Sequence, residues 1–318
     1  MKIFLQIIII FISLLLLSCE APLNVDAPFR QRYVLNGIMR NDSSVQYVTI
    51  TRSYKPANDI NPSSDTSNKF IAGADVNIWY KDTIYTLRDS PLTISTPGYK
   101  DSVHFYYIRN LKPDPGQNLQ IQALLPNGLL LQSNTTLPDV SSGNFFNADN
   151  DIIVPPVDGK NYISIIWQLL GTVYQPKIMI EYYRVGSSEL QEHQVPLIYS
   201  NQNGNSVPIY PGPTTINYFN IDVATISSAL NEIAANDQDK LNYNIVGIDI
   251  QLIVYDQNLS TYYSSLQNSV NDFTVIIDPP DYSNIQGGYG IFGSFSRTDY
   301  YLRFDDKYLD TLGYNNHY

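Results

Sequence analysis

Cys19 is the residue with the clearest chemistry in this 318-residue sequence, in which it is the only cysteine. An apolar run over residues 3–17 follows the basic residue Lys2 and ends just before Ser18. These features are typical of a cleaved export signal, since a full membrane span needs about 20 apolar residues. The residues that end at Cys19 resemble a bacterial lipobox. We therefore expect cleavage between Ser18 and Cys19 and lipidation of the Cys19 sulfur, so that acyl chains anchor the protein.

The residue after the cysteine indicates which membrane holds the anchor. It is Glu20, whereas the common signal for retention in the inner membrane has aspartate there. We therefore expect the outer membrane, with the cell surface favoured over the periplasmic leaflet. Residues 19–32 contain two prolines and no apolar periodicity, so they predict a tether. The alternatives to a lipoprotein signal peptide over residues 1–18 are an uncleaved anchor helix and an ordinary secretory signal.

The segment 288–293 has the form G-x-G-x-x-G, which is found in dinucleotide-binding sites. Such a site needs a strand before the glycines and a helix after them. Here Pro279 and Pro280 precede the glycines, and an aromatic, strand-like stretch follows. We expect these glycines at bulges or close backbone contacts instead.

Asn147, Asp149 and Asp151 have the alternate spacing with which a calcium-binding loop begins. In such a loop the sixth position is glycine and the twelfth is a bidentate glutamate. Here these positions hold Ile152 and Asp158. The sequence favours a solvated acidic linker and leaves an irregular calcium site near Asp149 and Asp151 open.

The sequence contains no recognisable catalytic pattern. The histidines His104, His193 and His317 have no second histidine at metal-binding spacing, and neither H-E-x-x-H nor G-x-S-x-G occurs. Glu189 and Glu192 are close together on what we expect to be an exposed loop. We therefore predict no enzyme activity, no catalytic residue, no metal and no cofactor. A carboxylate pair that only the fold brings together remains the alternative.

The composition limits the partners. The chain has 30 acidic and 19 basic residues and a formal charge of −11, which disfavours nucleic acid because phosphates are bound through Lys and Arg. Its 26 tyrosines suit a β-rich protein that displays aromatic rings. The pairs at 182–183, 262–263 and 300–301 predict one core ring each, because neighbouring strand residues face opposite sides. Their exposed rings favour a peptide or a glycan as ligand.

The strand patterns predict how these residues are positioned. Hairpins over 33–51, 75–87 and 119–132, with a further strand at 104–108, give about seven short strands. Regular turns between short strands favour an immunoglobulin-like β-sandwich over residues 33–139.

A second β-sandwich is expected over residues 160–318, after a linker at 140–159 that is rich in turn formers. Apolar residues at helical spacing predict a longer helix that Asp222 caps. A long strand is expected over 243–255, followed by a short helix from Ser260. The predicted fold is thus mainly β, with two immunoglobulin-like sandwiches and two helices in the second.

With these segments in view, the chain resembles a family of Bacteroidota lipoproteins, the domain-of-unknown-function family numbered 4249. Four segments carry the resemblance: the lipobox at Cys19 with the strand 33–38, the strand 73–78, the tyrosine-rich helix 262–266 and the C-terminal signature 283–293. The resemblance implies an outer-membrane lipoprotein, often encoded beside a TonB-dependent transporter. It supplies no catalytic residues.

The signature residues are expected to serve structure, with the glycines at positive φ angles or close backbone contacts. These residues are Asn284, Ile285, Gly287, Gly288, Gly290 and Phe292. We expect Ile291 and Phe292 to fill the core of the second unit. The predicted function is that of a non-enzymatic accessory or ligand-capturing partner of a TonB-dependent transporter. The alternatives are a surface adhesin or envelope scaffold and, third in order, a carboxylate-based hydrolase.

Overall fold

The computed structural model describes eleven parts of the chain: residues 30–53, 69–96, 99–141, 144–147, 153–156, 159–171, 173–202, 205–235, 237, 239–268 and 282–316. The expected signal peptide, Ser18, Cys19, Asp149, Asp151, Asp158 and His317 lie outside them. No helix within the described ranges is long and apolar enough to cross a membrane.

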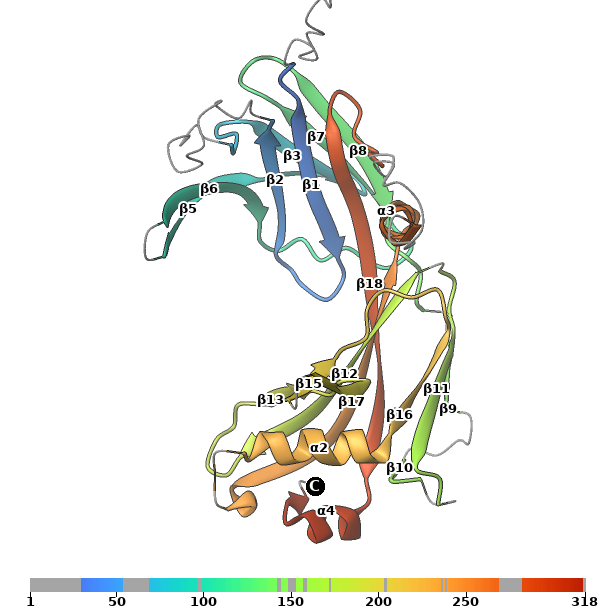
Figure 1. Ribbon diagram of the computed structural model, residues 1–318. Helices are drawn as coiled ribbons and strands as arrows, with labels where there is room; N and C mark the ends of the chain where they lie inside the picture. The colour runs from blue at the N-terminus through green and yellow to red at the C-terminus, as the bar shows by residue number, and fades with distance from the viewer. Residues whose placement is uncertain are drawn as a thin grey trace, which may run out of the picture.

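One long sheet runs through the molecule and joins two lobes, which we call upper and lower as Figure 1 draws them. Its main strand order is β13 (Gln191–Gln194), β12 (Tyr174–Arg184), β17 (Tyr243–Tyr255), β18 (Tyr289–Phe304), β1 (Tyr33–Arg40), β2 (Gln46–Arg52), β6 (Tyr99–Ile108) and β5 (Arg88–Thr96). Two short strands join it, β10 (Ile153–Val154) beside β18 and β19 (Asn315–Asn316) beside β17.

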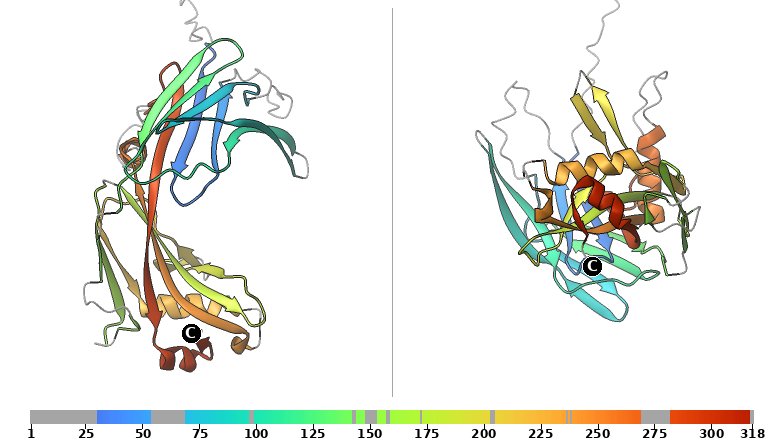
Figure 2. Two further views of the ribbon diagram at one scale, coloured as in Figure 1. Left: turned by 180° about the vertical axis from the view of Figure 1, so that it is seen from behind. Right: turned by 90° about the horizontal axis from the view of Figure 1, so that it is seen from below.

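Strand β18 connects the lobes. Its first half pairs with β1 in parallel, from Val34 opposite Tyr289 to Arg40 opposite Phe295. Its second half pairs with β17 in antiparallel register, from Tyr255 opposite Phe295 to Ile248 opposite Leu302. Figures 1 and 2 show this strand passing from one lobe into the other. The C-terminal part of the chain therefore completes both lobes.

The upper lobe has a second sheet that faces the long one. Its order is β4 (Thr83–Thr86), β3 (Asp75–Tyr80), β7 (Asn118–Leu124) and β8 (Leu130–Thr136). Alternate residues of its strands, such as Ile78 and Ile121, are buried against residues of the long sheet, such as Leu35 and Ile50. Burial of these side chains between the two sheets is the main stabilising contribution in this lobe.

The lower lobe packs a smaller sheet and a helix on the long sheet. The sheet order is β16 (Tyr218–Asp222), β11 (Tyr162–Gln168) and β9 (Asn144–Asn147), and helix α2 (Val223–Ile233) follows β16. Ile226 and Leu230, four residues apart on one side of α2, are fully buried in the same core as Trp167. Asp222 precedes α2 as its N-cap but forms no side-chain cap hydrogen bond.

The remaining elements lie around these layers: the hairpin of β14 (Ile198–Gln202) and β15 (Asn205–Ile209), the 3-10 helix η1 (Lys240–Asn242), α3 (Gln257–Asn268) and α4 (Asp306–Leu312). Helix α3 packs beside the middle of β18, with Leu259 in a small core that includes Ile253 and Ile291. Because α3 directly follows β17, it covers the region where the two lobes join.

The prediction of a mainly β protein is confirmed, with three α-helices in the described ranges. The helix expected from Ser260 begins earlier, at Gln257, and a further helix, α4, follows β18. The ranges 33–139 and 160–318 remain predictions as domain boundaries. Two segments of the expected linker form strands, because β9 pairs with β11 and β10 pairs with β18.

Candidate functional site

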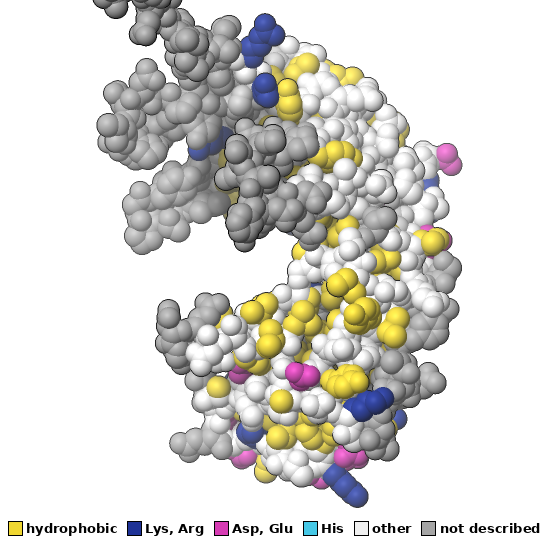
Figure 3. All heavy atoms as spheres, turned by 45° about the vertical axis from the view of Figure 1, so that its right-hand side comes forward, with side chains coloured by type: hydrophobic (Ala, Val, Ile, Leu, Met, Phe, Trp, Pro, Cys, Tyr) yellow, Lys and Arg dark blue, Asp and Glu magenta, His cyan; other side chains and the backbone are white. Residues whose placement is uncertain are grey.

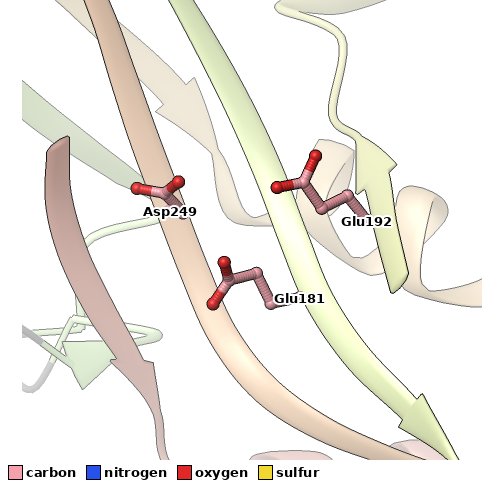
Figure 4. A group of neighbouring side chains, drawn as sticks. All are labelled: Glu181, Glu192 and Asp249. Atoms are coloured by element: carbon pink, nitrogen blue, oxygen red, sulfur yellow. The ribbon is translucent and has the colours of Figure 1, made fainter. Parts of the chain in front are cut away.

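Three carboxylates lie close together on neighbouring strands of the lower lobe (Figure 4). Glu181 of β12 is directly opposite Glu192 of β13, and Met179, two residues before Glu181, is opposite Asp249 of β17. Each residue offers one carboxylate oxygen, and these three oxygens lie within 4.8 Å of one another. We call Glu181, Glu192 and Asp249 the acidic cluster.

The local sequence explains why these side chains share one face. In β17, Ile248 and Ile250 face the core, so Asp249 between them faces the other side. The pairing of β12 with β17 shifts by one residue after Glu181, which is a β-bulge. Gly247 stands opposite Glu181 there, and a Cβ atom at Gly247 would lie 2.7 Å from the backbone oxygen of Leu302.

Within the described ranges, only one of the two carboxylate oxygens of Asp249 accepts hydrogen bonds. Its Oδ2 atom accepts hydrogen bonds from Arg297 Nη2 at 3.0 Å and from Gln251 Nε2 at 2.9 Å. Its Oδ1 atom accepts none, although the side chain is only 1% exposed. Arg297 also donates from Nε to Asp299 Oδ1 at 2.6 Å. One guanidinium is therefore shared between two carboxylates, and one buried carboxylate oxygen is left without a donor.

The electrostatics follow from burial and crowding. The pKa of Asp249 is raised from 3.8 to about 6, first by burial and then by the charges of Asp299 and Glu192, against the lowering effects of Gln251 and Arg297. The pKa of Glu181 is also raised, first by burial and then by the charges of Asp249 and Glu192. The ionised cluster thus carries more negative charge than its surroundings balance.

Such a cluster has three chemical uses. It can hold a cation, it can share a proton, or it can supply an acid and a base for hydrolysis. Hydrolysis requires contact with substrate, and Asp249 is buried. Glu192 is exposed, as is Tyr301, which is opposite Asp249 on β18 and 58% exposed. The geometry therefore favours cation binding, with Glu192 at the entrance.

A second group of charged side chains lies at the other edge of the long sheet. A pocket of about 320 Å³ is lined by Arg88, Tyr107, Ile108, Arg109 and Asn110. On strand β6, Tyr107 is opposite both Arg88 of β5 and Tyr47 of β2. The Arg109 guanidinium lies 5.7 Å from the centre of the Tyr107 ring, within cation–π range. Both arginines are exposed. We call this the arginine pocket.

The acidic cluster and the arginine pocket lie on the same face of the long sheet. On β18, Phe292 enters the upper core and Leu302 enters the lower core, ten residues further along. Because side chains alternate along a strand, both cores lie on one face. Tyr107 follows Tyr106, which is buried in the upper core, so it faces the opposite side, as Asp249 does.

The signature residues lie where β18 begins. Asn284 pairs with Phe292 like a strand neighbour: its Nδ2 donates to the Phe292 oxygen at 2.7 Å, and its Oδ1 accepts from the Phe292 nitrogen at 2.9 Å. Gly287 and Gly290 have φ angles of 82° and 110°, which favour glycine. A Cβ atom at Gly288 would lie 2.8 Å from the Tyr33 oxygen.

The prediction that Ile291 and Phe292 fill the core of the second unit is wrong. Phe292 is fully buried in the upper core, together with Ile285, and Ile291 packs in the small core beside α3. The reason is that the first half of β18 pairs with β1 and not with a strand of the lower lobe. The glycine-rich segment that matched G-x-G-x-x-G leads into this strand and not into a helix.

The other residues considered in the sequence have separate surroundings. His104 Nδ1 lies 3.0 Å from Asp89, and His193 Nε2 lies 3.1 Å from Glu232 of α2. Glu192 belongs to strand β13 and not to a loop. Tyr300 packs on the lower core while Tyr301 is exposed, as predicted, whereas Tyr262 and Tyr263 of α3 both pack on the small core around Leu259. Asn147 ends β9.

Sequence reasoning missed Glu181 and Asp249. A signal was present for Asp249, because it is the only charged residue in the apolar segment 243–255. A lone charge in a strand that is otherwise buried calls for a partner or a function. No comparable signal marks Glu181, since its neighbour strand β17 comes from a distant part of the chain.

The fold and the two charged groups define a two-lobed, mainly β protein built on one continuous sheet. The chain belongs to the domain-of-unknown-function family DUF4249, whose model matches residues 20–300. This match confirms the family noted in the sequence, while the lipid anchor stays a prediction. A search of curated proteins finds no match.

Proposed function

We propose that the protein is a non-enzymatic outer-membrane lipoprotein that captures an anionic ligand for a TonB-dependent transporter. The observation that carries ligand capture is the arginine pocket. Two exposed arginines, Arg88 and Arg109, flank Tyr107 in a chain whose formal charge is −11. The expected ligand is a peptide with a free carboxylate or an acidic glycan.

The chemistry of the pocket suits such a ligand. A guanidinium donates two parallel hydrogen bonds to a carboxylate, and an aromatic ring beside it offers a stacking surface. Tyr47 extends the aromatic row from Tyr107 and is 57% exposed. A peptide terminus or a sugar acid presents both the charge and the flat apolar surface that this row can contact.

Support for an anchor and a protein partner comes from two other features. Cys19 at the end of the apolar run supports a lipid anchor in the outer membrane, with the cell surface favoured. Ile198 and Ile209 are opposite each other on the separate β14–β15 hairpin and are 54% and 45% exposed. Exposed aliphatic pairs of this kind are typical of protein contacts when they lie in a larger patch. In the view of Figure 3, apolar side chains are spread over the lower lobe below a hollow between the lobes.

We include in this proposal that each lobe is a variant of the immunoglobulin-like sandwich. The support is the packing of two sheets around one core in the upper lobe. The ranges 33–139 and 160–318 would then describe two related units that share strand β18.

A matched peptide pair tests ligand capture. Fluorescence anisotropy would compare a labelled peptide that ends in a free carboxylate with the same peptide as its amide, and a uronic-acid oligosaccharide with a neutral one. We expect the acidic probe to bind more tightly and Arg109→Gln to weaken its binding about tenfold or more, because a charged hydrogen bond contributes about 1.5–3 kcal/mol. Arg303→Gln, an exposed arginine of the lower lobe, is the control. Equal binding of both probes, or equal effects of both variants, would contradict ligand capture.

Co-purification from mild-detergent extracts tests the transporter. A large barrel protein should accompany the wild type and be lost with Ile198→Asp combined with Ile209→Asp. Cell-surface binding that persists without any transporter would instead favour the adhesin or scaffold alternative.

Cys19→Ser should abolish incorporation of a clickable fatty acid, and equal labelling of both proteins would contradict the anchor.

A further inference from the structure

The acidic cluster is an unusual arrangement for a strand pair. Glu181 and Glu192 face each other across β12 and β13, and like charges in this position are destabilising. Asp249 adds a third carboxylate oxygen within 4.8 Å. An arrangement that costs stability in the protein alone calls for a compensating positive charge.

The protein itself supplies little compensation. Arg297 forms an ion pair with only one member of the cluster, Asp249, and divides its donors between Asp249 and Asp299. Gln251 donates to Asp249 at 2.9 Å and more weakly to Glu192 at 3.4 Å, but it carries no charge. Lys177 is opposite Gln251 on the same face and forms no ion pair with the cluster in the described structure.

The buried Oδ1 oxygen of Asp249 is a second indication of a bound cation, and it is independent of the unbalanced negative charge. It has no hydrogen-bond donor in the described structure, although the side chain is 1% exposed. A buried polar atom without a partner is costly, and native proteins keep such atoms mainly where they face a bound ion or water or serve a function. Arg297 and Gln251 hold the other oxygen, Oδ2, which fixes the carboxylate. Figure 4 shows the three carboxylates turned toward a common space.

We propose that Glu181, Glu192 and Asp249 bind one Ca²⁺ ion. Calcium is coordinated by oxygen at about 2.3–2.6 Å, so two oxygens on opposite sides of one ion can be up to about 5 Å apart. Oxygens within 4.8 Å of one another meet this condition. Magnesium requires a near-ideal octahedron at about 2.0–2.1 Å and usually keeps several waters beside one or two carboxylates, so a set of three carboxylates favours calcium. The exposed Glu192 leaves room for water ligands and for entry.

The donor set also argues against softer metals. Zinc and copper sites generally include histidine or cysteine. His193 is the nearest histidine along β13, but adjacent strand residues face opposite sides, and its ring is paired with Glu232 of α2. The proposed site uses carboxylates only and is separate from the arginine pocket. The inference therefore does not depend on the proposed function.

Calorimetric titration of the protein purified in mild detergent tests the proposal. After removal of divalent ions with EGTA, CaCl2 should bind with one-to-one stoichiometry and raise the melting temperature by several degrees, on the order of 5 °C at saturation. MgCl2 at the same concentration should produce a smaller shift. Glu181→Gln and Glu192→Gln should each weaken Ca²⁺ binding at least about tenfold, since each removes a charged ligand.

Glu189→Gln is the matched control, because it makes the same change at an exposed position two residues before β13. It should leave the affinity for Ca²⁺ unchanged. Wild-type protein without binding heat or a melting shift in millimolar CaCl2 would overturn the proposal. So would an equal loss of affinity in Glu189→Gln and Glu192→Gln, because that result indicates general attraction of cations to an acidic surface. Glu192 is exposed, so its variant should fold even if the one at Glu181 does not.

Discussion

The two edges of the long sheet carry opposite charges on the same face. At one edge, β12, β13 and β17 bring three carboxylates together, one of them fully buried. At the other, Arg88 of β5 and Arg109, which directly follows β6, are exposed beside a tyrosine. Three strands lie between β17 and β6, which is roughly 19 Å across the sheet at about 4.8 Å per strand. The two groups are farther apart than this, because β17 pairs with the second half of β18 and β1 pairs with its first half.

The difference lies in how each group is held. The arginines are solvated and one stacks on an aromatic ring, so they remain charged at little cost. The carboxylates are crowded and partly buried, and the pKa of Asp249 is raised accordingly. One backbone thus positions an open anion pocket and a constrained acidic cluster. The crowding of like charges therefore marks the acidic cluster as the more specialised of the two sites.

The largest effect is expected at the strand that both edges share. Phe292→Ala should lower the free energy of unfolding by about 3–5 kcal/mol, because the ring is fully buried between the two sheets of the upper lobe. If β18 makes the two edges one folding unit, peptide binding and Ca²⁺ binding should be lost together on heating. Phe292→Leu, which keeps most of the volume, is the control. Unchanged melting of the alanine variant would show that this packing is not present.

A smaller change in the free energy of unfolding, in this case an increase, is expected at the acidic cluster. The folded-state pKa of Asp249 lies above its ordinary value, so the stability that this group contributes is present below about pH 4 and is lost as the pH rises through about 6. In EGTA at pH 7, Asp249→Asn should therefore raise the free energy of unfolding by up to about 3 kcal/mol, since one pKa unit corresponds to about 1.4 kcal/mol.

Denaturant unfolding at pH 4 and pH 7 checks this prediction, because the gain should disappear at the lower pH. Arg88→Gln at the opposite edge is the comparison variant, and it should change stability by no more than about 0.5 kcal/mol because its side chain is exposed. Loss of stability in Asp249→Asn at pH 7 would mean that the ion pair with Arg297 outweighs the cost of burial.

The smallest effect is the coupling between the edges. Glu181→Gln combined with Arg109→Gln should give changes in stability that add within about 0.3–0.5 kcal/mol, because the sites share no partner and are far apart. A double-mutant cycle by denaturant unfolding measures this coupling energy. A larger value would show that the sheet transmits changes from one edge to the other.

Much of the local structure could be predicted from the sequence. The long strand at 243–255 has the predicted bounds, and the hairpins near 33–51 and 119–132 are present. These elements depend on alternation and turn residues that are neighbours in sequence. Helix α2 was likewise predictable from the spacing of Ile226 and Leu230.

The division of the chain between lobes could not be predicted in the same way. The parallel pairing of Val34 with Tyr289 joins residues from opposite ends of the chain, and no local pattern marks it. The acidic cluster has the same origin in part, since Asp249 of β17 joins Glu181 and Glu192 only through the pairing of distant strands in the sheet. Local patterns indicate elements, whereas the sites here depend on which elements become neighbours.

Anomalous diffraction from crystals soaked with Tb³⁺, an oxygen-binding ion that substitutes for Ca²⁺, tests the central claim most directly. We expect one strong peak among Glu181, Glu192 and Asp249, with carboxylate oxygens at roughly 2.3–2.6 Å and none at the arginine pocket. Excess Ca²⁺ should remove this peak, because the two ions would compete for the same site. A cluster without a peak, or with the Arg297 guanidinium turned into the space between the three carboxylates, would contradict the account.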